Sequence, residues 1–185
     1  ISAWSAKGGA GWHLIASPMT ETLEASEVAR LLSNDYDLYT FDQSQDLEWR
    51  NYEAEAFSTI ENKTGYLYAN SGNLTTISFA GTLANTASAT TLAYDVDATW
   101  AGFNLIGNPY PCNAYVDRSF YVLNTDGSDF TLGSNPIPPC SAILVQAQGT
   151  GESVTFSTTV SKNNPSIVAT VITAQTKNEK AIDKA

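Results

Sequence analysis

The sequence predicts an all-β fold, a β-sandwich or flattened barrel built from two repeated halves, with one short helix in the first half. Three observations predict it: a strand-forming composition, apolar residues that alternate along short segments, and an internal repeat. Thr, Ser, Asn, Tyr, Val and Ile are abundant, and this mixture suits half-buried strands and the turns that join them. At 185 residues and 43% hydrophobic content, the chain can bury one substantial core.

The repeat is clearest in residues 11–19, GWHLIASPM, and residues 102–110, GFNLIGNPY. Gly, Leu, Ile and Pro coincide at the same spacing, and Trp12 aligns with Phe103. Two more pairs of segments follow in the same order: 36–52 with 118–134, and 65–83 with 141–160. Strands drawn from one biased composition are the alternative explanation, but they account for alternation and not for the coincident residues. The pattern therefore indicates duplication of a strand-rich unit.

The repeated segments predict about five strands in each half. In the second pair of segments, Asp46-Leu47 aligns with Asp129-Phe130, and Asp126-Gly127 is a strong hairpin signal. A closing strand is expected in each half: residues 91–96 in the first and residues 166–173 in the second.

The halves differ where loops are expected. The first half carries an insertion in which residues 24–32 place Val28, Leu31 and Leu32 at helical spacing, with Ser26 as a candidate N-cap. This insertion is where we expect the short helix.

The predicted organisation has three parts. Residues 1–98 form the first half, residues 99–175 form the second, and residues 176–185 are a polar tail or linker. The two halves are expected to form one compact unit.

A proline motif ends the first strand of each half. Pro109 and Pro111 cannot continue a ladder, and Asn108 can fix the turn by bonding to nearby backbone. Pro18 holds the matching place in the first half. A motif shared by both halves is more typical of architecture than of a binding site.

The charge of the chain limits its partners. The net charge is −10, which repels nucleic acid and anionic lipid surfaces. No apolar run is long enough for a transmembrane helix. We therefore expect no nucleic-acid partner and no membrane insertion, and no residue pattern calls for a cofactor.

Two cysteines, Cys112 and Cys140, are the only ones in the chain. There is no CxxC pair, and the single histidine, His13, cannot complete a zinc site with two thiols alone. A Cys112–Cys140 disulfide is predicted, because it would tie the loops that lack the helical insertion. Two buried thiols are the alternative.

The segment GFNLIGNPYPCNAYVD, residues 102–117, resembles a duplicated β-rich module of Bacteroidota cell-surface and secreted proteins associated with type IX secretion. The first-half segments GWHLIASP and YLYAN resemble the companion half of that module. The resemblance implies an extracellular or outer-membrane-surface location, and it transfers no catalytic residue. Because the chain begins at Ile1 in a strand pattern, we expect it to be part of a larger exported protein.

Candidate sites are few. His13 lies inside a strand and no GxSxG motif supplies a nucleophile, so no catalytic residue is assigned. Asn124, Asp126 and Asp129 resemble a fragment of a calcium loop, although a hairpin turn explains them more simply.

Trp49 and Tyr52 are the candidate ligand-binding aromatics, since they follow a hairpin in an acidic segment. Two functions are expected to compete. The first is a non-catalytic extracellular module with a structural or protein-interaction role, whose partners are other domains of the parent protein. The second is a carbohydrate-binding or adhesin domain that uses exposed aromatics. A host or environmental glycan or protein is a possible ligand in either case.

Overall fold

The structure is a computed structural model that describes residues 11–33, 35–55, 57–71, 76–86, 89–124 and 127–159. In the first half, the elements are β1 (His13–Ala16), β2 (Leu23–Glu24), the 3-10 helix η1 (Ala25–Glu27), β3 (Tyr36–Phe41), β4 (Trp49–Asn51), α1 (Tyr52–Glu55), β5 (Thr59–Ile60) and β6 (Gly65–Asn70). The later elements are β7 (Ala89–Thr91), β8 (Phe103–Gly107), β9 (Tyr121–Leu123), β10 (Phe130–Leu132), β11 (Ala142–Gln146) and β12 (Ser153–Thr155). The all-β prediction is confirmed.

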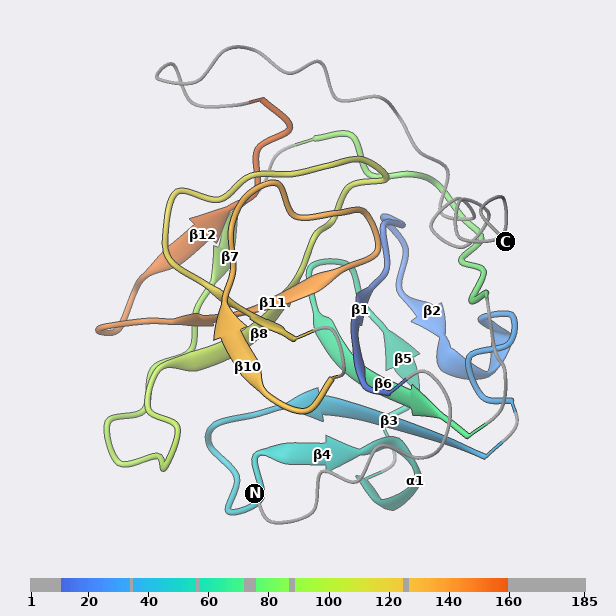
Figure 1. Cartoon of the computed structure of the whole chain (residues 1–185), viewed down its shortest axis with the longest axis horizontal. Helices are drawn as coiled ribbons and strands as arrows, with labels where there is room; N and C mark the ends of the chain where they lie inside the picture. The colour runs from blue at the N-terminus through green and yellow to red at the C-terminus, as the bar shows by residue number, and fades with distance from the viewer. Residues whose placement is uncertain are drawn as a thin grey trace.

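Two four-stranded antiparallel sheets carry the fold, and they repeat one topology (Figure 1). The first sheet has the order β1-β6-β3-β4, and the second has the order β8-β11-β9-β10. These are the strands of the matched segments, taken in the same order. The prediction of two repeated β halves is therefore confirmed at the level of strand pairing.

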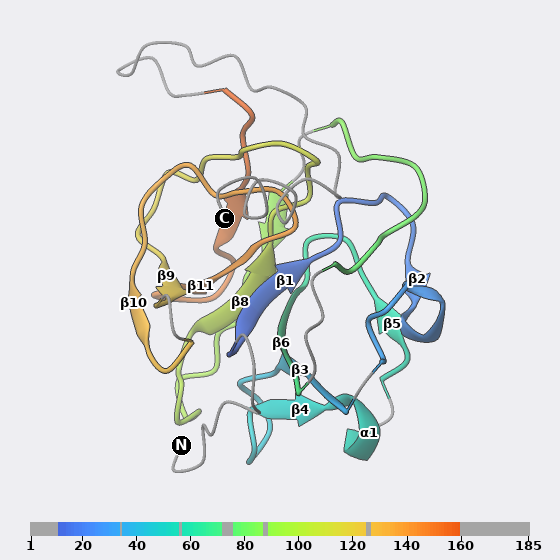
Figure 2. The same cartoon turned by 45° about the vertical axis from the view of Figure 1, so that its right-hand side comes forward.

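The two sheets pack against each other as an open sandwich and do not close into a barrel. Strands β1 and β6 of the first sheet contact β8 and β11 of the second, and β1 lies beside β8 in Figure 2. One apolar cluster at this contact draws on both sheets, with Ala16, Leu105, Ala142 and Leu144 buried in it.

Each sheet also buries its outer face, because loops of its own half fold over it. Leu38, Tyr66 and Tyr68 join one core in the first half, and Ile143 and Val145 join another in the second. Burial on both faces explains why all six residues of β6 are buried. It also explains why the central strands of the two sheets read as nearly continuous apolar runs.

The predicted short helix does lie in the first half, but it does not lie in the 24–32 insertion where we expected it. The α-helix is α1, whereas the 24–32 insertion contains only the three-residue η1. Val28 is extended and Arg30 has a φ of 68°, so the chain cannot continue as a helix there. Val28 and Leu31 are nevertheless buried in the first-half core. Their helical spacing reflected a compact turn against that core.

The closing strand of the first half was also placed wrongly. β7 pairs with β12 of the second half, and Leu92, which follows it, is buried in the second-half core. The chain therefore crosses to the second half before the predicted boundary at residues 98–99. The predicted strand at 166–173 and the tail at 176–185 lie outside the described residues.

The strand register corrects one alignment of the repeat. Tyr39 and Tyr121 hold equivalent places, since both face the central strand of their sheet, at Leu67 and Leu144. Counting along each hairpin from that pair makes Trp49 the equivalent of Phe130. Leu47, which the sequence aligned with Phe130, is 78% exposed at the hairpin.

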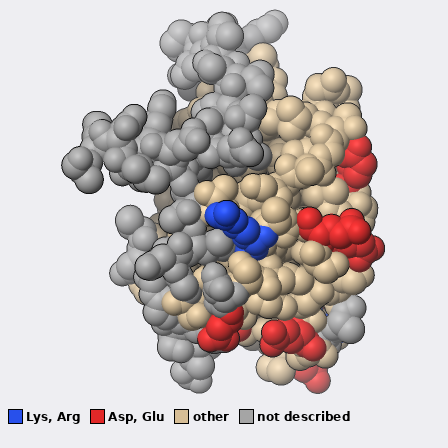
Figure 3. Space-filling model, turned by 90° about the vertical axis from the view of Figure 1, so that its right-hand side faces the viewer, with Lys and Arg blue, Asp and Glu red and all other residues tan. Residues whose placement is uncertain are grey.

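Within the described residues, no helix has the length and apolar character needed to cross a membrane. Among the described residues on the face shown in Figure 3, Asp and Glu form separate groups along the lower and right-hand edges, and Lys and Arg lie near the centre.

Candidate functional site

Buried and half-buried aromatic side chains gather where the two sheets meet, and we call this set the aromatic seam. Its members come from the facing sides of both sheets: Trp12, Tyr39, Phe41, Trp49, Phe103, Tyr121 and Phe130. Strand alternation produces the set, because every second residue of a strand points to the same face. Of the two predicted ligand residues, Trp49 belongs to the seam and Tyr52 does not.

Trp49 lies at the centre of the seam. Its ring stands edge-on to Phe41, with centroids 5.0 Å apart, and stacks on Phe130 from the other half at 6.4 Å and 17° between planes. Stacking on a sugar needs an open ring face. Phe130 stacks on one face of Trp49, so this side chain links the two halves.

Tyr52 lies elsewhere, in α1. It packs edge-on against Tyr36 and Phe57, with centroids 6.2 and 5.3 Å away, at the core on the outer face of the first sheet. Trp49 belongs to the inner face. The structure therefore does not bring the two predicted aromatics together on one platform.

Gln43 is a buried amide that no sequence pattern singles out. From the β3–β4 hairpin, Nε2 donates to the carbonyls of Ala93 (2.9 Å) and Phe103 (3.0 Å). Oε1 accepts from the backbone N–H groups of Asp95 (3.0 Å) and Gly102 (2.8 Å). The amide thereby ties the first half to the segment that enters β8. Its partners lie far along the chain, so no local pattern separates it from its exposed neighbours.

Asn108 is fully buried and fixes the proline motif of the second half. Nδ2 donates to the carbonyls of Cys112, Ile137 and Pro138 at 2.9–3.1 Å, and Oδ1 accepts from the N–H of Tyr110 at 3.0 Å. The turn-fixing role expected from the sequence is thus present. At the matching place in the first half, the Ser17 hydroxyl accepts only the N–H of Met19, at 3.2 Å.

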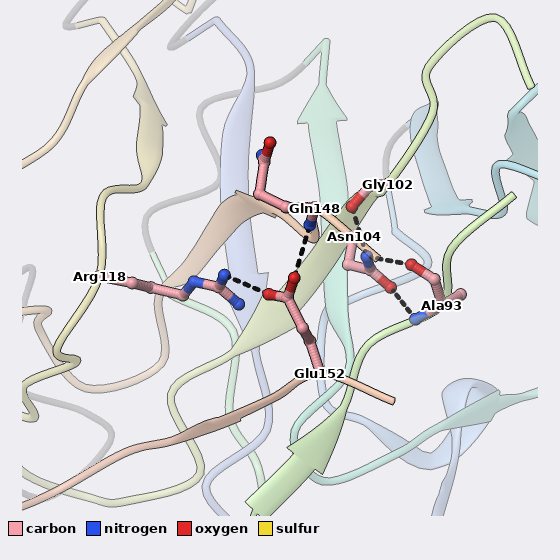
Figure 4. Close-up of polar contacts among 6 residues, drawn as sticks. All are labelled: Ala93, Gly102, Asn104, Arg118, Gln148 and Glu152. Carbon is pink, nitrogen blue, oxygen red and sulfur yellow. Dashed lines mark hydrogen bonds and ion pairs between the residues drawn. The ribbon is translucent and has the colours of Figure 1, made fainter. Parts of the chain in front are cut away.

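Asn104 adds a further amide tie at the start of the second half. Its side chain accepts from the Ala93 N–H at 2.8 Å and donates to the carbonyls of Ala93 and Gly102 at 2.9 and 2.7 Å (Figure 4). Three buried or half-buried amides therefore hold backbone segments and are not directed at a shared cavity.

Among the described residues, Glu152 is one of three carboxylates whose contacts lower their pKa. Hydrogen bonds from Arg118, at 2.6 Å, and from the Gln148 N–H, at 2.8 Å, lower the pKa of Glu152 (Figure 4). In Asp42, burial acts to raise the pKa, but hydrogen bonds from Ser44 outweigh it and the pKa falls.

Glu21 shows the largest effect. Its carboxylate accepts from the backbone N–H of Thr82 with both oxygens, at 2.9 and 3.1 Å, and from Thr20 Oγ1 at 3.2 Å. These bonds lower the pKa of Glu21 to about 2. In all three carboxylates the partners are groups that hold a loop, and none is a second carboxylate poised for acid–base chemistry.

The weak calcium candidate forms a closed turn in the part that the structure describes. Asn124 Oδ1 accepts from the N–H groups of Ser128 and Asp129, at 2.9 and 3.2 Å, and Asp129 Oδ1 accepts from the N–H of Phe130 at 2.8 Å. Asp126 lies outside the described residues. Among the described residues, no group of three or more His, Cys, Asp and Glu could hold a metal ion.

Cys112 and Cys140 do not form the predicted disulfide in the structure. Cys112 is buried in the second-half core, and burial raises the pKa of its thiol. Cys140 has a φ of 56° at the inter-half contact, where its carbonyl accepts from the Ala16 N–H at 3.1 Å. The Cys112 side chain thus packs in a core, whereas the Cys140 backbone contributes to the contact between the halves. His13 is exposed on β1, opposite Tyr68 in the register.

No family model, curated protein or solved structure matches this chain. Its function must therefore be inferred from its own residues.

Proposed function

We propose that this chain is a non-catalytic extracellular module of a larger bacterial surface protein, with a structural or protein-interaction role. Its partners are the other domains of that protein. The resemblance of residues 102–117 to Bacteroidota surface modules supports the location. No cofactor is needed for this role.

The observation that carries the proposal is how the polar side chains are used. Gln43 and Asn108, both buried, satisfy backbone groups of segments distant in the chain. Glu21 and Glu152 hold loops through backbone N–H groups. An enzyme directs such groups toward a substrate, whereas here they stabilise one rigid shape.

Surface labelling of the intact bacterium tests the location. An epitope inserted at the Gly149–Gly151 turn of the parent protein suits this purpose, because a Cβ at either glycine meets no atom within 4 Å. Antibody binding to intact cells is expected. Binding only after lysis contradicts the proposal.

The carbohydrate-binding alternative is favoured by one observation, the aromatic seam, most of whose side chains are half-buried. A glycan array with the wild-type chain separates the two functions. Binding that is lost in Trp49→Ala and kept in Tyr52→Ala supports a sugar site at the seam. Absence of binding to every glycan leaves the structural or protein-interaction role.

A further inference from the structure

The two halves touch through reciprocal contacts. Ile15 of β1 bridges to Ser141 of the second half, and its equivalent Ile106 of β8 bridges to Thr64 of the first. The same exchange occurs in the backbone bonds on either side. The Ala16 N–H donates to the Cys140 carbonyl at 3.1 Å, and the Gly107 N–H donates to the Lys63 carbonyl at 2.7 Å.

The reciprocity extends to backbone conformation. Lys63 and Cys140, the two acceptors, both have positive φ, at 67° and 56°. Gly11 and Gly102, which precede β1 and β8, both have a φ of 76°. The halves are therefore related by an approximate two-fold axis, as the subunits of an isologous dimer are.

Each half presents one glycine and one alanine at this axis, in opposite order. Ala16 pairs with Gly65 in the first sheet, and Gly107 pairs with Ala142 in the second. Across the interface, Gly107 faces Ala16 and Gly65 faces Ala142. A Cβ added at Gly107 would lie 2.5 Å from the Cβ of Ala16, and one added at Gly65 would lie 2.7 Å from the Cβ of Ala142.

These distances set the rule for which halves can pair. If two first halves met in the same geometry, Ala16 would face a second Ala16 at a separation that Cβ atoms do not adopt, and two Gly65 residues would leave a gap. Two second halves would meet the same conflict at Ala142 and the same gap at Gly107. Only unlike halves place one methyl group at each contact.

We propose that this surface is selective between copies of the chain: a half accepts its unlike partner and rejects its own equivalent from a second copy. Such selectivity matters wherever two copies meet, because every copy carries two surfaces of nearly the same shape. The glycine–alanine pairs then exclude contacts between two first halves and contacts between two second halves.

The test is refolding from denaturant over a range of protein concentrations, followed by measurement of the mass in solution. The wild type should refold to one chain at every concentration. Ala16→Gly with Ala142→Gly removes both methyl groups that block like-with-like pairing. This variant should shift toward masses of two or more chains as the concentration rises.

The matched control is Ala25→Gly with Ala114→Gly, which removes one fully buried methyl group from the core of each half, away from the interface. It should lose stability but refold to one chain. Equal oligomer fractions in the interface and control variants overturn the proposal.

A second measurement covers the case in which the glycine variants unfold. Gly65→Ala should lower the urea midpoint, and adding Ala142→Gly should recover part of that loss, since the methyl group moves across the same contact. The added Cβ would still lie 2.7 Å from Leu105 Cγ and 3.2 Å from the Leu105 backbone carbon, so the double variant should stay below the wild type. If the urea midpoint of the double variant is equal to or lower than that of Gly65→Ala, the packing of glycine against alanine across the interface is not complementary.

Discussion

Trp49 and Phe130 hold equivalent places in the two halves and stack on each other, with ring centroids 6.4 Å apart. Trp49 lies opposite Phe41 in one hairpin, and Phe130 lies opposite Leu123 in the other. Side chains that meet their own equivalents lie near the axis that relates the halves. Their contact therefore exists only when both halves are in place.

Removing this stack should destabilise the whole chain. Trp49→Ala is expected to lower the free energy of unfolding by roughly 2 kcal/mol, below the cost for a fully buried ring because Trp49 is half-buried. With Phe130→Ala, the two effects should be non-additive by about 1 kcal/mol, the usual worth of an aromatic pair. Urea denaturation of the four proteins in the cycle gives the coupling, and simple additivity would show that the stack contributes nothing.

Gln43→Ala should be costly, because this hairpin residue is buried. It removes the Gln43 hydrogen bonds from two N–H groups and two carbonyls of the β8 entry segment, although the Ala93 carbonyl keeps its bond from Asn104. A loss of about 2–4 kcal/mol is expected, since each unsatisfied buried polar group costs about 1–3 kcal/mol before water enters. Gln45→Ala, at an exposed position of the same hairpin, should be nearly neutral. Similar losses of stability in Gln43→Ala and Gln45→Ala would show that the hydrogen bonds of the Gln43 amide do not stabilise the fold.

Asn108→Ala and Ser17→Ala compare equivalent places in the two halves. Asn108 makes four hydrogen bonds to backbone and Ser17 makes one. We expect a loss of about 3 kcal/mol for Asn108→Ala and about 1 kcal/mol for Ser17→Ala. Thermal or urea unfolding measures both, and a larger loss at Ser17 runs against the prediction.

Glu21 should make the stability depend on pH. Its pKa in the folded state is about 2, against an ordinary value of 4.5. A lowered carboxyl pKa stabilises the fold above pH 4.5 and loses that effect as the pH falls toward 2. The stability difference between wild type and Glu21→Gln should therefore shrink over this range. A difference that stays constant from pH 7 to pH 2 excludes the carboxylate as its source.

Alanine substitutions at three glycines should separate the stability cost of a steric clash from the stability cost of a positive φ. Gly127 has a φ of 70° and would place a Cβ within 2.7 Å of the Trp12 backbone N and O, whereas Gly151 has a φ of 80° in open space. Gly149 has neither constraint. Substitution by alanine should cost most at Gly127, about 1 kcal/mol at Gly151, and close to nothing at Gly149. Equal costs at Gly127 and Gly151 would remove the contact with Trp12 from the explanation.

Much of the fold could be predicted because its signals are local. The coincident residues of the 11–19 and 102–110 segments identified the first strand of each half, and the order of the segments matched the order of the strands. The hairpin at Gly127 followed from its turn chemistry. The 24–32 insertion misled because a compact turn against a core spaces Val28 and Leu31 as a helix does.

The candidate site could be predicted less well. Trp49 and Tyr52 are neighbours in sequence, but a strand and the turn after it send them to opposite faces of one sheet. Gln43 and Gln45 look alike in the chain, and only the approach of the β8 entry segment buries the first. The cysteines were paired by loop position, yet Cys112 packs in a core while the carbonyl of Cys140 binds the other half.

The sequence by itself determined the all-β class, the duplication and most of the strands, because alternation and repeated motifs act over a few neighbouring residues. The tertiary structure alone decided that β7 pairs with β12, that Trp49 meets Phe130, and that each glycine at the axis faces an alanine. These outcomes depend on contacts between residues far apart in the chain. Because the loops of the two halves differ in length, the sequence does not show which residues meet across the axis. Close packing at the axis determines these pairs.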